Sequence, residues 1–123
     1  DVMIEPGKNI ISVIKLEIGY DPLKLILSKD NPITINDSAF PVILHEPYYS
    51  ARKALITLSI GNDKTKAITS NTKILTLHFK ALKSASITQV YFGNETQTLS
   101  LSSDESGGSN VLSTTVPSYI QIK

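Results

Sequence analysis

The side chains that most often carry acid–base or metal chemistry are few in this chain and far apart. The two histidines, His45 and His78, form neither an H-x-H nor an H-E-x-x-H pattern, so their spacing indicates no metal site and no general base. The absence of cysteine excludes a thiol nucleophile, a thiolate zinc site and a disulfide. Serine is abundant, but there is no G-x-S-x-G elbow, and the carboxylates are scattered. We therefore predict that the chain is not an enzyme.

One segment, from Asp104 to Asn110, contains the oxygen ligands and glycines that a calcium loop requires. It lacks the acids at alternate positions and the final bidentate glutamate of an EF-hand. A solvated turn is the favoured interpretation of this segment. We therefore predict that this chain binds neither a metal nor a cofactor of its own.

Charge and hydropathy argue against two kinds of partner. Lys+Arg number 12 and Asp+Glu number 11, which gives a formal charge of +1, and Arg52 is the only arginine. A chain with almost no net positive charge and a single arginine guanidinium is poorly suited to bind the phosphates of nucleic acid. No apolar run approaches the roughly 20 residues that a membrane span needs. The 123 residues are expected to form a single domain, residues 1–123.

Apolar and polar residues alternate with a period of two in four segments, residues 14–20, 54–60, 75–80 and 116–122. In the last of these the inward positions would be Val116, Ser118, Ile120 and Ile122. Such alternation is typical of antiparallel sheets with one face on the core and one in water. Turn-forming clusters of Gly, Pro, Asn and Asp separate the segments. The sequence predicts an all-β, two-sheet antiparallel sandwich of roughly eight or nine strands.

The segment from Ile10 to Leu25 adds a specific signature, because its alternating strand ends in Tyr20-Asp21-Pro22. Here the tyrosine can fill the edge of the core, the aspartate can accept local backbone N–H groups, and the proline fixes the turn. This segment resembles the cohesin domain, in which a strand ends in Tyr-Asp-Pro followed by x-x-Leu. Later segments resemble the same family in the same order, and they are residues 39–44, 53–60, 72–81 and 116–122.

The resemblance implies a nine-stranded jelly roll from an exported prokaryotic protein, secreted or at the cell surface. Cohesins are non-catalytic and bind a dockerin module, and the calcium of that complex belongs mainly to the dockerin's paired loops. The first strand of the family would precede Asp1, so we expect it to be absent from this chain or supplied from outside it. A sandwich without that strand has an open edge through which two copies could associate. The chain has no signal peptide, and we expect it to be part of a longer polypeptide.

Strand parity places the implied dockerin-binding surface on one sheet face, with Val13 and Leu55 as exposed apolar residues at its centre. Cellulosomal cohesins offer an outward Asn and Asp where this chain has Val13 and Lys15, and Gly61 or Asn62 stands where an acidic residue is expected. The predicted partner-binding residues are Val13, Lys15, Glu17, Leu55, Thr57 and Ser59, with Tyr49 and Asn62 at the rim.

Two other functions remain open at this stage. A carbohydrate-binding module of related sandwich fold would stack sugar rings on flat aromatic side chains, and Tyr48 and Tyr49 are the candidates. A structural spacer in a cell-surface or appendage protein would have no partner for this face. Glycan binding that is lost when Tyr48 or Tyr49 is changed to Ala would favour the first of these.

Overall fold

The chain folds as an antiparallel β-sandwich. The computed structural model describes residues 1–82, 86–101 and 108–122. Its elements are β1 (Val2–Ile4), β2 (Ile11–Tyr20), β3 (Leu25–Leu27), β4 (Ile33–Ile35), β5 (Val42–Tyr49), β6 (Lys53–Ser59), a 3-10 turn (Lys64–Lys66), β7 (Thr72–Leu77), β8 (Phe79–Ala81), β9 (Ser86–Phe92), β10 (Gln97–Ser100) and β11 (Ser118–Ile122). The predicted all-β fold class is confirmed.

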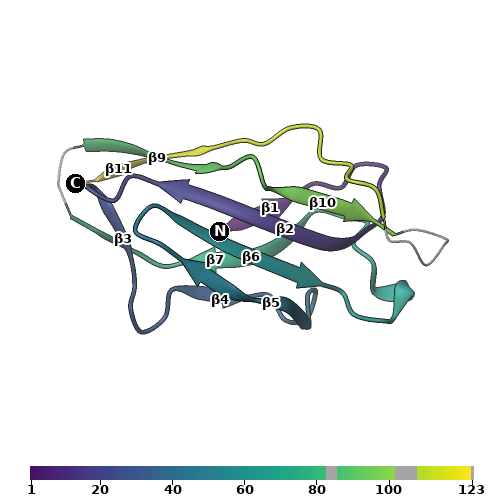
Figure 1. Ribbon diagram of the computed structural model, residues 1–123. Coiled ribbons are helices and arrows are strands. Elements are labelled where there is room, and N and C mark those ends of the chain that lie inside the picture. Colours follow the sequence, from purple (N-terminus) through teal and green to yellow (C-terminus); the bar gives the residue numbers. More distant parts are fainter. Residues whose placement is uncertain (83–85, 102–107, 123) are drawn as a thin grey trace.

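Two layers of strands enclose the core. One sheet has the order β11-β9-β2-β6-β5, and β10 pairs with β2 beyond the end of β9. The other layer consists of a three-stranded sheet, β1-β7-β4, and a two-stranded sheet, β3-β8. Figure 1 shows β2 and β6 running side by side along the length of the molecule, with β5 beside β6.

The alternation that predicted the strands also builds the core. In β2 the side chains of Ile14, Leu16 and Ile18 are buried, and in β6 those of Ile56 and Leu58 are buried beside them. Each such side chain contributes roughly 1.5–3 kcal/mol when it leaves water. The inward residues of one sheet therefore meet those of the other, and they leave the alternate positions of β2 and β6 on the outside.

The single strand expected over residues 75–80 is divided in two at His78. The backbone N–H of His78 donates to the carbonyl of Pro32 at 2.9 Å, and its carbonyl accepts from the amide of Ser28 at 2.8 Å. Before His78 the chain, as β7, pairs with β4. After His78 it continues as β8 and pairs with β3. The structure therefore has more and shorter strands than the sequence predicted, because one strand serves two sheets in turn.

The strands at the two ends of the chain lie at the edges of their sheets among the described residues. Val2–Ile4 forms a strand that pairs with β7 and ends the order β1-β7-β4. In the last segment Ile122 is buried, but Val116 is 80% exposed. The inward position predicted for Val116 is wrong, because the closing strand begins only at Ser118, after Pro117.

The Tyr20-Asp21-Pro22 turn has the local bonds that the sequence suggested. The carboxylate of Asp21 accepts from the amide of Leu23 at 2.9 Å. The Tyr20 ring packs edge-on against Phe79 with ring centroids 4.9 Å apart, and its hydroxyl donates to the carbonyl of Ser50 at 2.9 Å. Burial raises the pKa of the Tyr20 phenol. Tyr20 thus links the end of β2 to the β5–β6 turn.

We expect Tyr20→Phe to lower the free energy of unfolding by about 1 kcal/mol, because it removes one hydrogen bond and leaves the Ser50 carbonyl without that donor. Urea denaturation measures the change. Tyr48→Phe is the matched control, since the Tyr48 ring is exposed on β5. An equal effect of the two substitutions would contradict this role of Tyr20.

Candidate functional site

The outward side chains of β2 and β6 form one continuous surface. The strands pair so that Val13 lies opposite Ser59, Lys15 opposite Thr57, and Glu17 opposite Leu55. Residues directly opposite each other in an antiparallel pair share a face. We call the whole surface of the large sheet on which these six residues lie the outer face. The sequence prediction that they lie together on one face is therefore confirmed, although their binding to a partner stays a prediction.

Three of these side chains are less accessible than the sequence suggested. Val13 and Leu55 are half-buried, whereas they were expected to be exposed. Ser59 is buried, and its hydroxyl accepts from the amide of Gly61 at 3.0 Å. For Leu55 and Ser59 the reason is the next strand, since β5 places Tyr48 opposite Leu55 and Val42 opposite Ser59. Ser59 is therefore a poor contact residue, while Leu55 keeps part of its surface available.

The predicted rim position of Tyr49 is wrong. Tyr49 pairs with Ala54, which faces the core, so its ring lies on the other side of the sheet. There it lines a cavity of about 340 Å³ together with Tyr20, and burial raises the pKa of its phenol. The register of β5 shifts on both sides of His45. These irregularities, with Pro47 inside the strand, place Tyr48 on the outer face.

Asn62 is exposed just beyond the end of β6, as the sequence predicted for the rim. It follows Gly61, whose φ of 88° lies in the left-handed region that favours glycine. Asp63 comes next and caps the 3-10 turn, where hydrogen bonds from the hydroxyl and the amide of Thr65 lower the pKa of its carboxyl. This local structure fixes the direction in which the chain leaves the outer face.

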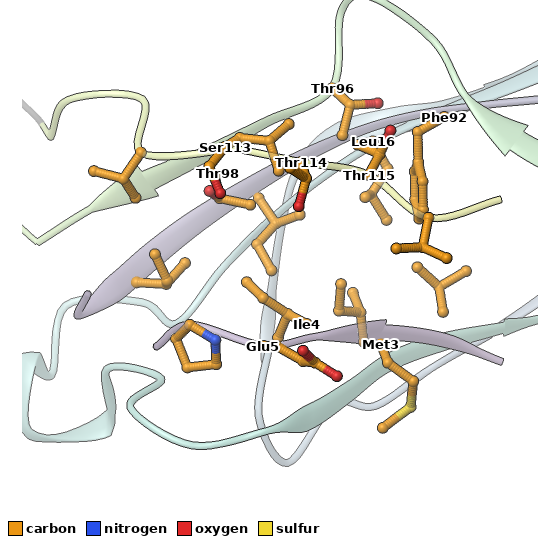
Figure 2. A pocket seen from close by; sticks show the side chains of 18 of the residues that line it. Met3, Ile4, Glu5, Leu16, Phe92, Thr96, Thr98, Ser113, Thr114 and Thr115 are labelled. Carbon is orange, nitrogen blue, oxygen red and sulfur yellow. The ribbon is translucent and has the colours of Figure 1, made fainter. Parts of the chain in front are cut away.

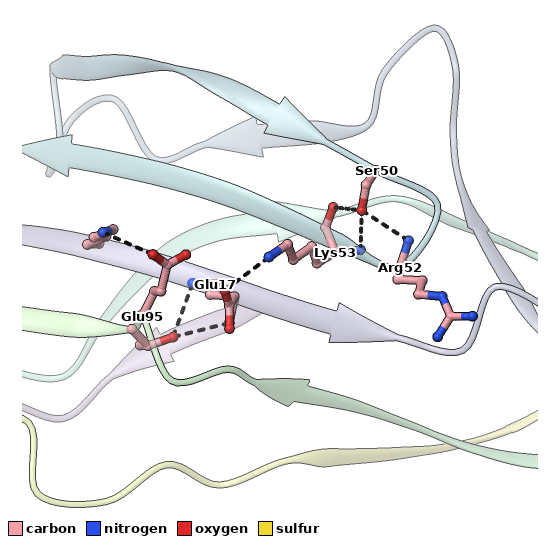
Figure 3. A network of polar contacts seen from close by, with 7 residues as sticks. Glu17, Ser50, Arg52, Lys53 and Glu95 are labelled. Carbon is pink, nitrogen blue, oxygen red and sulfur yellow. Dashed lines mark hydrogen bonds and ion pairs between the residues drawn. The ribbon is translucent and has the colours of Figure 1, made fainter.

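Charged side chains on the outer face pair with charges on neighbouring segments (Figure 3). The ammonium of Lys53 lies 3.5 Å from a carboxylate oxygen of Glu17, and that of Lys15 lies 3.9 Å from Glu95. The hydroxyl of Thr96 makes two hydrogen bonds with the backbone of Glu17. It accepts from the Glu17 amide and donates to the Glu17 carbonyl, each at 3.1 Å. The segment after β9 therefore forms one border of the face.

Tyr91 is a residue of this surface that the predicted partner-binding set did not include. It lies opposite Gly19 in the β2–β9 pair, and a Cβ at Gly19 would lie only 2.5 Å from Cζ of its ring. The ring therefore lies directly over the glycine, and it is 45% exposed. A signal was available in the sequence, because a glycine inside a strand often marks the close approach of another group.

The groups that could have carried metal or acid–base chemistry are dispersed. His45 is exposed on β5, and His78 shares a hydrogen bond of 2.8 Å with the hydroxyl of Thr34. Within the described residues no three His, Asp or Glu side chains are grouped so that they could hold a metal ion. Residues 104–107 of the candidate calcium segment, Asp104 to Asn110, lie outside the described residues. No helix in the described part of the chain is long and apolar enough to span a membrane.

Comparison with solved structures identifies the architecture. The chain is similar to a chain of the complex of CaDoc0917 with CaCohA2, with a TM-score of 0.72 and 13% identity over 99% of this chain and 86% of that one. It is also similar to the cohesin module of a family 33 glycoside hydrolase from Clostridium perfringens ATCC13124, with a TM-score of 0.63 and 13% identity over 94% of this chain and 76% of that one.

A third similar structure is the third cohesin of ScaC in complex with the ScaB dockerin, from Acetivibrio cellulolyticus. It has a TM-score of 0.62 and 19% identity over 84% of this chain and 78% of that one. No protein-family model and no curated protein matches the sequence. The fold is therefore the cohesin-like jelly-roll sandwich that the sequence resemblance implied.

We expect Gly19→Ala to move the Tyr91 ring, because the new methyl group would occupy the space of the ring. In nuclear magnetic resonance spectra the ring protons of Tyr91 should shift and lose their contacts with residue 19, while the ring signals of Tyr48 stay unchanged. The stability cost should be small, since the far end of the ring can swing away. Unchanged Tyr91 signals would show that its ring does not lie over Gly19.

Proposed function

We propose that this chain is a non-catalytic protein-binding module that binds a dockerin-type module through its outer face. The observation that carries this proposal is the half-buried apolar side chain of Leu55, which lies beside the exposed aromatic ring of Tyr48. Tyr91 adds a second exposed ring at the other border of the face. Apolar centres with aromatic side chains are typical of the parts of interfaces that contribute most affinity.

The paired charges around this centre give the surface a polar rim. Lys15 and Lys53 each face a carboxylate at 3.5–3.9 Å, and the ammonium groups remain partly exposed. The Lys15–Glu95 pair is exposed at both side chains and contributes little to stability, so its charges are available to another protein. In the other pair the Lys53 side chain is exposed, while that of Glu17 is only 15% exposed. Such groups mainly determine which partner binds and how quickly, while the apolar centre contributes affinity.

Similarity of fold supports the choice of partner, because two of the similar structures are complexes with dockerins. In this proposal calcium belongs to the partner, whose loops need it to fold, and this chain contributes no ligand. The protein would act outside the cell, secreted or at the cell surface. The binding would hold another protein in place and would change no chemical bond.

We expect dockerin modules encoded in the same genome to bind this chain with micromolar or tighter affinity in calcium, and not at all with a chelator. Isothermal titration calorimetry measures both. Leu55→Asp should weaken the binding by at least about 30-fold, because it places a charge at the apolar centre. Ile26→Asp is the matched control, since Ile26 is an exposed apolar residue on β3, in the other layer, and should bind like the parent chain.

Two results would contradict the proposal. If Leu55→Asp and Ile26→Asp bind equally well, the outer face is not the binding surface. If no dockerin binds, a glycan array tests the carbohydrate alternative. Because Tyr48 and Tyr49 lie on opposite sides of the sheet, glycan binding at the outer face would be lost in Tyr48→Ala and kept in Tyr49→Ala. Binding of neither ligand would favour a structural spacer.

A further inference from the structure

The part of the outer face that β9 and β11 form carries a second group of exposed side chains. β11 ends the large sheet, and it pairs with β9 so that Tyr119 lies opposite Gln89 and Gln121 opposite Ile87. Tyr91 follows on β9 on the same side of the sheet, where its ring lies over Gly19. We call this surface the β9–β11 platform, and its members are Ile87, Gln89, Tyr91, Tyr119 and Gln121.

The inward side of the same two strands determines which side chains face outward. Thr88 and Ile122 are buried. Phe92 lines a cavity of about 530 Å³ that β1 borders, and Figure 2 shows its ring there. Because side chains alternate between the two sides of a strand, the platform residues point away from the core. Accordingly, Tyr119 is 70% exposed and Ile87 is 63% exposed.

The β9–β11 platform offers flat rings and amide groups, and none of its five residues is charged. Tyr91 and Tyr119 are diagonal neighbours across the strand pair, a relation that places residues roughly 7–8 Å apart. The side-chain amides of Gln89 and Gln121 both donate and accept hydrogen bonds. The ammonium of Lys24 lies beside the platform, where it donates to the carbonyl of Ile87 at 2.9 Å. The ion pairs of the outer face lie instead around β2.

We propose that the β9–β11 platform binds a neutral glycan, an extended chain of β-linked glucose units. The hydroxyls of such a sugar are equatorial, so each face of its ring presents C–H groups that stack on the flat side of a tyrosine. The hydroxyls then point sideways, where glutamine amides can donate to them and accept from them. An anionic glycan would lose water from its charges without gaining a cation from these five residues.

This glycan site is separate from the surfaces discussed above. The apolar centre at Leu55 lies on β6, and Tyr48, the candidate of the carbohydrate alternative, lies on β5 at the opposite end of the sheet order from β11. The proposal therefore does not depend on the dockerin proposal, and a test with sugar alone separates the two.

Nuclear magnetic resonance titration of the whole chain with cellohexaose, a short β-linked chain of glucose, tests the proposal. We expect the amide signals of β9 and β11 to shift, and sugar C–H protons to show Overhauser contacts with the rings of Tyr91 and Tyr119. Tyr119→Ala should weaken the binding about tenfold, because it removes one stacked ring. Tyr119→Trp keeps a flat ring and should retain the binding. Tyr48→Ala removes an exposed ring on β5 and, as the matched control, should bind like the parent chain.

Four results would overturn the proposal. The first is an absence of shifts at millimolar cellohexaose, which the unmodified chain decides without any variant. The second is loss of binding in Tyr48→Ala but not in Tyr119→Ala, which would place the sugar on β5. The third is equal binding of a galacturonic acid oligomer, because the platform would then not select a neutral chain. The fourth is a dimer at the concentration of the titration whose contact covers Tyr119, because the occupant would then be a second copy.

Discussion

The pairing of β2 with β6 determines the rest of the structure. Seven consecutive residues of β2, from Val13 to Gly19, lie opposite residues of β6 from Ser59 to Lys53. Because side chains alternate between faces, this one register buries Leu16 against the opposite layer and at the same time places Glu17 on the outer face. A slip by one residue would exchange the two sets. The apolar core therefore fixes the composition of the candidate binding surface.

The neighbours of this pair decide how accessible that surface is. On one side β5 covers Leu55 and Ser59, and on the other β9 brings the Tyr91 ring over Gly19. Gly93 plays a related part, because a side chain there would collide with the carboxylate of Glu17. The outer face is consequently a shallow surface of partly buried apolar groups with paired charges at its border. Such a surface is suited to a folded protein rather than to a small substrate.

The sequence predicted the fold and the central strands because a period of two depends only on local residues. It predicted the members of β2 and β6 on the outer face for the same reason. It failed for Tyr49 because an irregular strand around Pro47 breaks the parity, and for Ser59 because its neighbour on β5 covers it. Glu95 was missed because its approach to β2 depends on contacts between distant segments, whereas Gly19 inside a strand was a usable signal for the close approach of Tyr91.

Amide hydrogen exchange of the complex with a calcium-loaded dockerin module tests the central claim most directly, since it maps the contact on the unmodified chain. The proposed function predicts that the amides of β5, β6 and β2 exchange more slowly in the complex, while those of β1, β4 and β7 exchange at unchanged rates. Protection confined to β1, β4 and β7, or an unchanged pattern over the whole domain at saturating dockerin, would contradict the assignment of the outer face as the binding surface.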